Sequence, residues 1–216
     1  MTLHSGPAQL SQIRRLAIVL ALNLALIGGL VAVGITARSV GVLAAAGDTL
    51  ADSVALVLGL VAVVLRDQDP AHPRARRPTA IVALINATIL ITVTAGVTVE
   101  AIVRLGGGSR AVLGLPMAVV SLITLVVMVS GAFVLGRSAH REDIHMKSVF
   151  VDTLADAAAA AGVLVAGVVI WITGGLYWLD PVIALILAVV IGYAGIRLAV
   201  QAIAALRGAD VDFDND

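Results

Sequence analysis

The sequence predicts an all-α, polytopic membrane protein with six transmembrane helices, on three observations. Hydrophobic residues make up 60% of the 216 residues and charged residues only 13%. The mean hydropathy of +1.07 is far above that of a water-soluble domain. The apolar residues are also gathered into six stretches of continuous hydrophobicity, whereas the strands of a membrane β-barrel alternate apolar and polar side chains. Helices are therefore the expected spanning elements.

Each apolar stretch reaches the roughly 20 residues that a helix needs to cross the hydrocarbon core of a bilayer. The predicted spans are residues 14–35, 41–65, 79–105, 111–135, 147–173 and 178–206. The first begins with two arginines, as a secretory signal does, but its apolar run is too long and no small-residue cleavage site is evident. We therefore expect the first stretch to be a helix like the others.

The distribution of lysine and arginine predicts the orientation. The amino terminus, the loops near 66–77 and 137–147, and the carboxyl end carry all but three of the 14 basic residues; the exceptions are Arg38, Arg104 and Arg110. By the positive-inside rule both termini are cytoplasmic, and we expect a multi-pass protein of the inner (plasma) membrane. Residues 1–13 then form a cytoplasmic segment, 14–207 one six-helix transmembrane domain and 208–216 a short acidic cytoplasmic tail.

Two features of the composition limit the partners. The formal net charge is zero, so the clustered basic surface that displaces counterions from nucleic acid is not expected. The sequence contains no cysteine, which excludes disulfides and thiolate ligands. A bound metal would therefore have to be held by oxygen or by imidazole nitrogen.

The same pentapeptide, Asp-Thr-Leu-Ala-Asp, occurs at 48–52 in the second span and at 152–156 in the fifth. A spacing of four places each pair of carboxylates on one helix face, with about 6 Å between their Cβ atoms. The two spans run in opposite directions, and both pairs lie roughly 8–16 Å from a helix end at 1.5 Å per residue. Both pairs therefore approach the middle of the bilayer, where Asp48, Asp52, Asp152 and Asp156 can form a four-carboxylate cage.

Such a cage needs a source of positive charge. A single membrane aspartate costs on the order of 3 kcal/mol or more to insert, and four together also repel one another. One interpretation is that the aspartates stay protonated and hydrogen-bond neighbouring helices. The other is that a divalent cation balances them and protons replace it when it leaves, so that metal binding and proton release form one equilibrium, as an antiporter requires.

With these motifs the chain resembles the transmembrane domain of the cation diffusion facilitator family. Members of this family are proton-coupled exporters of divalent transition metals. The paired acidic motif is the specific part of the resemblance, which extends from Asn23 to the end of the sixth span. Consistent segments are 43–48 (Leu-Ala-Ala-Ala-Gly-Asp), 83–87 (Ala-Leu-Ile-Asn-Ala), 99–102 (Val-Glu-Ala-Ile) and 177–181 (Tyr-Trp-Leu-Asp-Pro). The resemblance implies that the four aspartates form the family's tetrahedral transport site, and it suggests a homodimer.

Two departures from the family pattern affect these expectations. Many zinc-transporting members have histidine at the position of Asp48 or Asp152, whereas the ligands of this site would all be oxygen atoms. Oxygen ligands favour harder ions, so the expected substrate moves in part from Zn²⁺ towards Mn²⁺ or Fe²⁺. The family usually carries a cytoplasmic metal-sensing domain after the sixth span, and this sequence stops at Asp216. It therefore represents either the short, domainless type or a truncated chain, and a dimer would have to form through membrane helices.

Four further polar residues lie in or at the ends of the predicted spans. Asn23 and Asn86 lie in otherwise apolar helices, where each either forms an interhelical hydrogen bond or supports the aspartates of the cage. Glu100 and Asp180 lie at predicted outer ends within reach of water, so helix termination or ion pairing is expected of them. We do not expect either to be a metal ligand.

The loops contain weaker candidates. Asp69 and His72 lie between the second and third spans, where some relatives hold an accessory metal, although the arginine-rich residues that follow depart from the family pattern. His140, Asp143 and His145 precede the fifth span and could collect cations, but solvated surface residues are the commoner explanation.

Together these features predict a secondary transporter, not an enzyme, that exports Zn²⁺ or a related ion (Mn²⁺, Fe²⁺, Co²⁺ or Cd²⁺) in exchange for protons. Two alternatives remain open at this stage. A proton or cation channel would use the acids as a relay without holding a metal. A non-transporting accessory subunit would pair them with basic residues of a partner.

Overall fold

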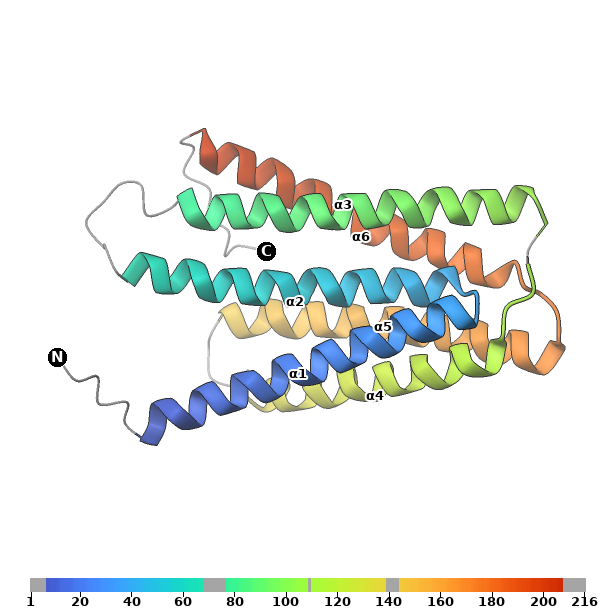
Figure 1. Ribbon diagram of the computed structural model, residues 1–216, viewed down its shortest axis with the longest axis horizontal. Helices are drawn as coiled ribbons and strands as arrows, with labels where there is room; N and C mark the ends of the chain where they lie inside the picture. Colours follow the sequence, from blue (N-terminus) through green and yellow to red (C-terminus); the bar gives the residue numbers. More distant parts are fainter. Residues whose placement is uncertain (1–6, 68–76, 109, 139–143, 208–216) are drawn as a thin grey trace.

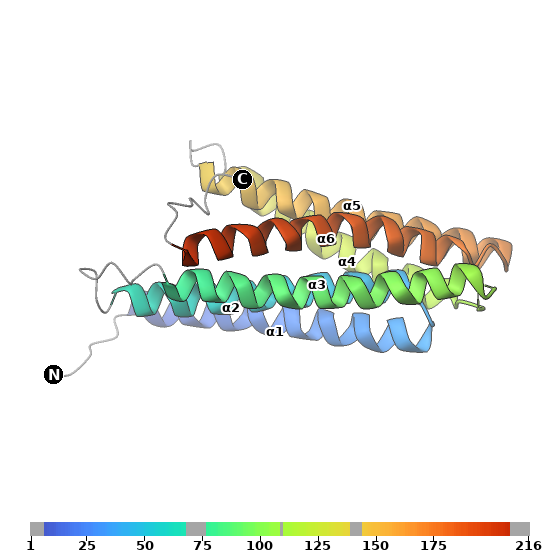
Figure 2. The ribbon, with the colours of Figure 1, turned by 90° about the horizontal axis from the view of Figure 1, so that it is seen from above.

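The computed structural model describes the backbone of residues 7–67, 77–108, 110–138 and 144–207, with side chains described for most of the residues between 21 and 57, 80 and 133, and 154 and 207. The described part is an elongated bundle of six helices that run roughly along one axis (Figures 1 and 2). They are α1 (Pro7–Thr36), α2 (Val40–Asp67), α3 (Arg77–Gly106), α4 (Gly114–Ser138), α5 (Ile144–Thr173) and α6 (Leu179–Leu206). The predicted all-α, six-helix fold is confirmed.

The helix ends lie within a few residues of the predicted spans, except at the start of α1. This helix begins at Pro7, seven residues before the predicted start at 14. Proline is favoured in the first turn of a helix, and the alanine, glutamine and leucine that follow are good helix formers. Residues 7–13 are therefore helical although they are outside the apolar run, which hydropathy alone does not detect.

Several described segments have the character of membrane spans. By length and composition, Ala80–Gly106, Leu154–Thr173 and Leu179–Leu206 could each cross a bilayer, and Asn23–Thr36 and Gly114–Ser130 are shorter apolar helices. Large apolar side chains such as Val189, Ile172 and Phe133 are more than 60% exposed. In water such surfaces would be unfavourable, whereas in a bilayer they face lipid.

The helices alternate in direction. Helix α1 begins and α6 ends at one end of the bundle, and the connections α1–α2, α3–α4 and α5–α6 all lie at the other end, which we name the connection end (Figure 1). Between α1 and α2 only residues 37–39 intervene. Arg38 has φ +56°, and this left-handed conformation reverses the chain in so short a turn.

Glycines allow the closest approaches between helices. A Cβ atom on Gly114 of α4 would lie 2.4 Å from the backbone nitrogen of Trp171 on α5, and one on Gly167 of α5 would lie 2.8 Å from that of Ala118. In the same way, a Cβ on Gly195 of α6 would lie 3.1 Å from Leu90 Cβ on α3. Helix α4 therefore packs tightly against α5 and α3 against α6, while α2 and α5 touch only sparsely.

Candidate metal site

Three of the four predicted ligands converge between α2 and α5. Each of Asp48, Asp52 and Asp156 offers a carboxylate oxygen, and these oxygens all lie within 4.8 Å of one another. Asp48 and Asp52 are one turn apart on α2, and Asp156 faces them from α5. Asp152 lies on α5 one turn before Asp156, but its side chain is outside the described residues.

The carboxylates border a pocket at the sparse contact between these helices. The lining residues come from four helices, α2, α4, α5 and α6: Ala45, Asp48, Thr49, Thr124, Met128, Asp156, Ala159, Ala160, Leu187 and Ile191. Asp48 and Asp156 are half-buried, whereas Asp52 is exposed and is not among the described lining residues. The three neighbouring carboxylates therefore include two that line the pocket and one on the exposed surface of α2.

The other polar groups of the lining are hydroxyls held by their own helices. Thr49 donates to the carbonyl of Ala45 at 2.9 Å, and Thr124 donates to the carbonyl of Val120 at 3.0 Å. Each hydroxyl proton is therefore engaged by a backbone carbonyl of its own helix. Among the described lining residues, only Asp48 and Asp156 carry an ionisable group.

Small residues around the aspartates let the helices come together. A Cβ atom on Gly47 would lie 2.2 Å from Val93 Cγ1 on α3, so α2 approaches α3 at the residue next to Asp48. On α5, Ala157 and Ala160 are buried in the alanine run that follows Asp156. Small side chains such as these allow helices to pack closely.

The cluster has the chemistry of a cation site. Three carboxylates this close cannot all ionise without a compensating charge, so protons or a cation must balance them. First-row divalent metals bind carboxylate oxygens at about 2.0–2.2 Å, so two oxygens on one ion lie at most about 4.4 Å apart. The limit of 4.8 Å in this cluster is slightly wider, and small side-chain movements would bring the three oxygens around one ion. The cluster is therefore a candidate cation site.

The remaining candidates are not brought to the pocket. Asn23 is half-buried on α1 and Asn86 is buried on α3, and the described lining residues include neither. Asn86 Oδ1 makes no hydrogen bond among the described residues, so the interhelical bond expected of it is not seen at that oxygen. Asp69 and His72 lie outside the described residues.

The other loop candidates also lie outside what the structure describes. His140 and Asp143 are in the undescribed segment before α5, and His145 is in α5 without a described side chain. Thr124 and Met128 line the pocket from α4, and sequence reasoning missed them. Nothing in the apolar sequence of α4 distinguishes these two residues from its lipid-facing residues.

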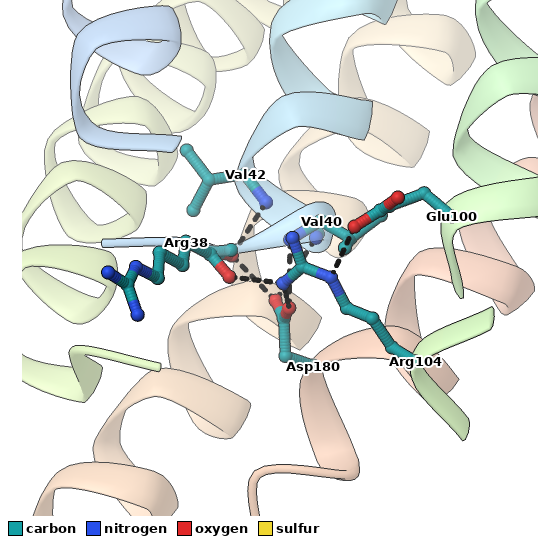
Figure 3. A network of polar contacts seen from close by, with 8 residues as sticks. Arg38, Val40, Val42, Glu100, Arg104 and Asp180 are labelled. Atoms are coloured by element: carbon teal, nitrogen blue, oxygen red, sulfur yellow. Dashed lines mark hydrogen bonds and ion pairs between the residues drawn. The ribbon is translucent and has the colours of Figure 1, made fainter. Parts of the chain in front are cut away.

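The expectations for Glu100 and Asp180, ion pairing and access to water, hold to different extents. The expected ion pair of Glu100 is present, since Arg104 Nε lies 2.7 Å from Glu100 Oε1. Asp180 also lies near Arg104, with its Oδ2 3.9 Å from Arg104 Nη1, but the expectation that water reaches Asp180 is wrong. Its side chain is fully buried because it accepts hydrogen bonds from the first turn of α2 (Figure 3). Nothing in the sequence around residue 180 indicates this contact.

Comparison with known proteins gives a consistent pattern. The family model for the cation efflux transmembrane domain matches residues 16–207. The zinc transporter ZitB of Yersinia pestis is 29% identical over 182 residues, which are 82% of this chain and 57% of that protein. The cadmium, cobalt and zinc/H⁺-K⁺ antiporter of Bacillus subtilis strain 168 is 25% identical over 174 residues, 79% of this chain and 55% of that protein.

A further relative, the zinc transporter ZitB of Escherichia coli K12, is 26% identical over 187 residues, covering 84% of this chain and 58% of that protein. The chain thus spans little more than half the length of the curated relatives that it matches.

Proposed function

The chain belongs to the cation efflux transmembrane domain family, and from this premise we propose that it is a proton-coupled secondary transporter that exports a divalent transition metal, most readily Zn²⁺, from the cytoplasm. The observation that carries the proposal is the convergence of Asp48, Asp52 and Asp156 from two helices to within 4.8 Å. Placing several carboxylates inside a membrane bundle costs free energy, and a bound cation would offset that cost by balancing their charge.

We propose Asp152 as the fourth ligand. It precedes Asp156 by one helical turn in the same pentapeptide that places Asp48 before Asp52, so the two aspartates of each pair share a helix face. Four carboxylates suit the tetrahedral coordination of Zn²⁺. An all-oxygen site would also accept Mn²⁺ or Fe²⁺, and Co²⁺ and Cd²⁺ are included because a similar protein is named for them.

The charge balance of the site would couple metal binding to proton release. Two positive charges on the ion cannot neutralise four carboxylates, so part of the site holds protons, and further protons replace the ion when it leaves. An inward proton gradient then drives metal outward. Sparse contact between α2 and α5, together with the small residues after Asp156, gives the helices room to change the side from which the site is open.

The proposal includes a location and an assembly. The positive-inside rule places both termini in the cytoplasm and the connection end outside the inner (plasma) membrane. The homodimer implied by the family resemblance, formed through membrane helices, stays a prediction. Mass measurement of the chain in nanodiscs would test it, and a single-chain mass would contradict it.

Zinc flux tests the transport proposal. Proteoliposomes with a zinc-sensitive dye inside and an imposed pH gradient would report uptake by the purified chain. We expect Asp52→Asn and Asp156→Asn each to reduce the rate at least about tenfold, because each removes a charged ligand worth more than about 1.4 kcal/mol. The control Glu100→Gln removes an exposed carboxylate outside the cluster and should keep the parent rate.

Other outcomes would favour the rival functions. Unchanged uptake in both aspartate variants would contradict the metal site. A current that does not saturate and ignores chelators would favour a channel, and no zinc binding in a calorimetric titration would favour an accessory subunit. A panel of Zn²⁺, Mn²⁺, Fe²⁺, Co²⁺ and Cd²⁺ in the same assay would rank the substrates.

A further inference from the structure

A buried carboxylate at the connection end holds the start of α2. The two oxygens of Asp180, in the first turn of α6, accept hydrogen bonds from the backbone nitrogens of Val40 at 2.8 Å and Gly41 at 3.1 Å. Ser39 Oγ donates to Asp180 Oδ1 at 2.6 Å and accepts from the nitrogen of Val42 at 3.0 Å. Figure 3 shows Asp180 beside Val40 at the start of α2, with Arg104 close by.

This arrangement satisfies the N-terminus of α2 from outside the helix. The first N–H groups of a helix have no partner within it, and those of Val40, Gly41 and Val42 are all bonded here by Asp180 or Ser39. The negative carboxylate also lies where the helix dipole favours an anion. Since Asp180 has no exposed surface, these bonds are what make its burial tolerable.

The third helix joins the same contact. Arg104, near the end of α3, places Nη1 3.9 Å from Asp180 Oδ2 and donates from Nη1 to the carbonyl of Arg38 in the α1–α2 turn. Its Nε bonds Glu100 at 2.7 Å. We name Ser39, Arg104 and Asp180 the corner latch, because they tie the start of α2 to α3 and α6.

The latch and the candidate metal site share two helices, α2 and α6. Asp48 follows Val40 by eight residues on the same helix, which is about 12 Å or two turns. The pocket wall opposite includes Leu187 and Ile191 of α6, the helix that carries Asp180. The depth and rotation of α2 relative to α6 therefore fix where the carboxylates of α2 lie in the pocket.

We propose that Asp180 is a positioning residue for metal binding: its hydrogen bonds to the N-terminus of α2 set the position of Asp48 and Asp52 relative to α6. The proposal rests on the proposed function, because it assigns Asp180 an effect on the same site. Asp180 touches no metal. Without it, the start of α2 loses its bonds to α6, and the helix can shift along or about its axis.

Distances between spin labels test the position of α2 directly, because the chain has no cysteine and labels can be attached to introduced ones. Val57 on α2 and Val200 on α6 are exposed and would carry one pair. Ile85 on α3, also exposed, and Val200 would carry the control pair, since α3 and α6 are in extensive contact and approach closely at Leu90 and Gly195. In Asp180→Ala we expect the α2–α6 distribution to broaden or shift and the α3–α6 distribution to stay unchanged.

Zinc affinity per folded protein is the second readout. Ligand atoms must keep within about 0.5 Å of their productive geometry, so Asp180→Ala should weaken zinc binding at least about tenfold at a temperature well below its melting point. Asp180→Asn keeps an oxygen that accepts hydrogen bonds and should recover part of the affinity. Glu100→Gln, which removes the other carboxylate beside Arg104, should bind zinc as the parent does.

The outcomes separate this proposal from the proposed function. An unchanged α2–α6 distance, or unchanged zinc affinity in a less stable Asp180→Ala, would overturn the positioning role and leave only a structural one. If Asp180→Ala fails to fold, Asp180→Asn carries both measurements. It should then show a smaller shift of the α2–α6 distance and a smaller loss of zinc affinity, and parent values for either would overturn the positioning role. Absence of zinc binding in the parent would instead overturn the proposed function and with it the role of Asp180 in metal binding.

Discussion

Gly47 provides a sharp test of how α2 is seated beside the metal site. A Cβ atom at this residue would lie 2.2 Å from Val93 Cγ1 on α3, whereas carbon atoms in contact are ordinarily about 3.5–4.0 Å apart. Val93 is β-branched, and in a helix one rotamer strongly dominates for such a side chain. In Gly47→Ala, α2 must therefore move away from α3 or Val93 must leave its preferred rotamer.

The expected magnitude follows from two opposing effects. Overpacking of this kind typically costs about 1–3 kcal/mol, while replacing glycine by alanine inside a helix gains about 0.5–1 kcal/mol. The free energy of unfolding of Gly47→Ala should thus fall by about 1 kcal/mol, within limits of about 0–2.5 kcal/mol. In a Val93→Ala background the clash is gone, so the same substitution should become stabilising by about 0.5–1 kcal/mol.

Unfolding by SDS in mixed micelles would measure these changes, with zinc titration alongside. Because Gly47 adjoins Asp48, the displaced α2 should also bind zinc more weakly, and Val93→Ala should restore the affinity. Gly96→Ala on α3 is the matched control, since a Cβ there meets no atom within 4 Å. If Gly47→Ala behaves like Gly96→Ala, or destabilises equally in both backgrounds, the close approach of α2 and α3 is refuted.

Two further predictions concern the site and the packing of α4 on α5. Zinc affinity should fall as the pH falls, by up to about tenfold per pH unit for each proton released on binding. Calorimetric titration in two buffers of different ionisation enthalpy would count the released protons. An affinity that does not depend on pH, without proton release, would contradict the coupling. Gly114→Ala should destabilise by about 3 kcal/mol or more, because the new Cβ would lie 2.4 Å from the backbone nitrogen of Trp171. Gly28→Ala, which meets nothing within 4 Å, is its control in the same unfolding assay, and equal stability of the two variants would count against the tight α4–α5 contact.

The sequence predicts the helices and the acidic convergence for simple physical reasons. A continuous apolar run of membrane length has few alternatives to a helix, and a spacing of four fixes the face on which two aspartates lie. The meeting of Asp48 and Asp52 with Asp156 follows from the repeat and from the opposite directions of the two helices. The early start of α1 at Pro7 could not be found in this way, since helix formation outside the apolar run leaves no hydropathy signal.

What the sequence could not supply depends on contacts between distant segments. Thr124 and Met128 line the pocket because α4 packs tightly on α5, a contact made by backbone atoms at Gly114 and Gly167. Ion pairing was foreseen for Asp180, but its burial was not. Its partners are the first N–H groups of a helix 140 residues earlier, and backbone donors carry no mark in the sequence.

A cysteine ligand and Co²⁺ would test the central claim most directly. In Asp156→Cys, the introduced thiol would be the only one in the chain, and a thiolate bound to Co²⁺ absorbs strongly in the near ultraviolet by charge transfer. We expect this band in Asp156→Cys and not in Leu154→Cys, whose side chain is exposed two residues away on α5. Binding of Co²⁺ by Asp156→Cys without the band would show that Asp156 does not contact the metal, and the proposed site would be wrong.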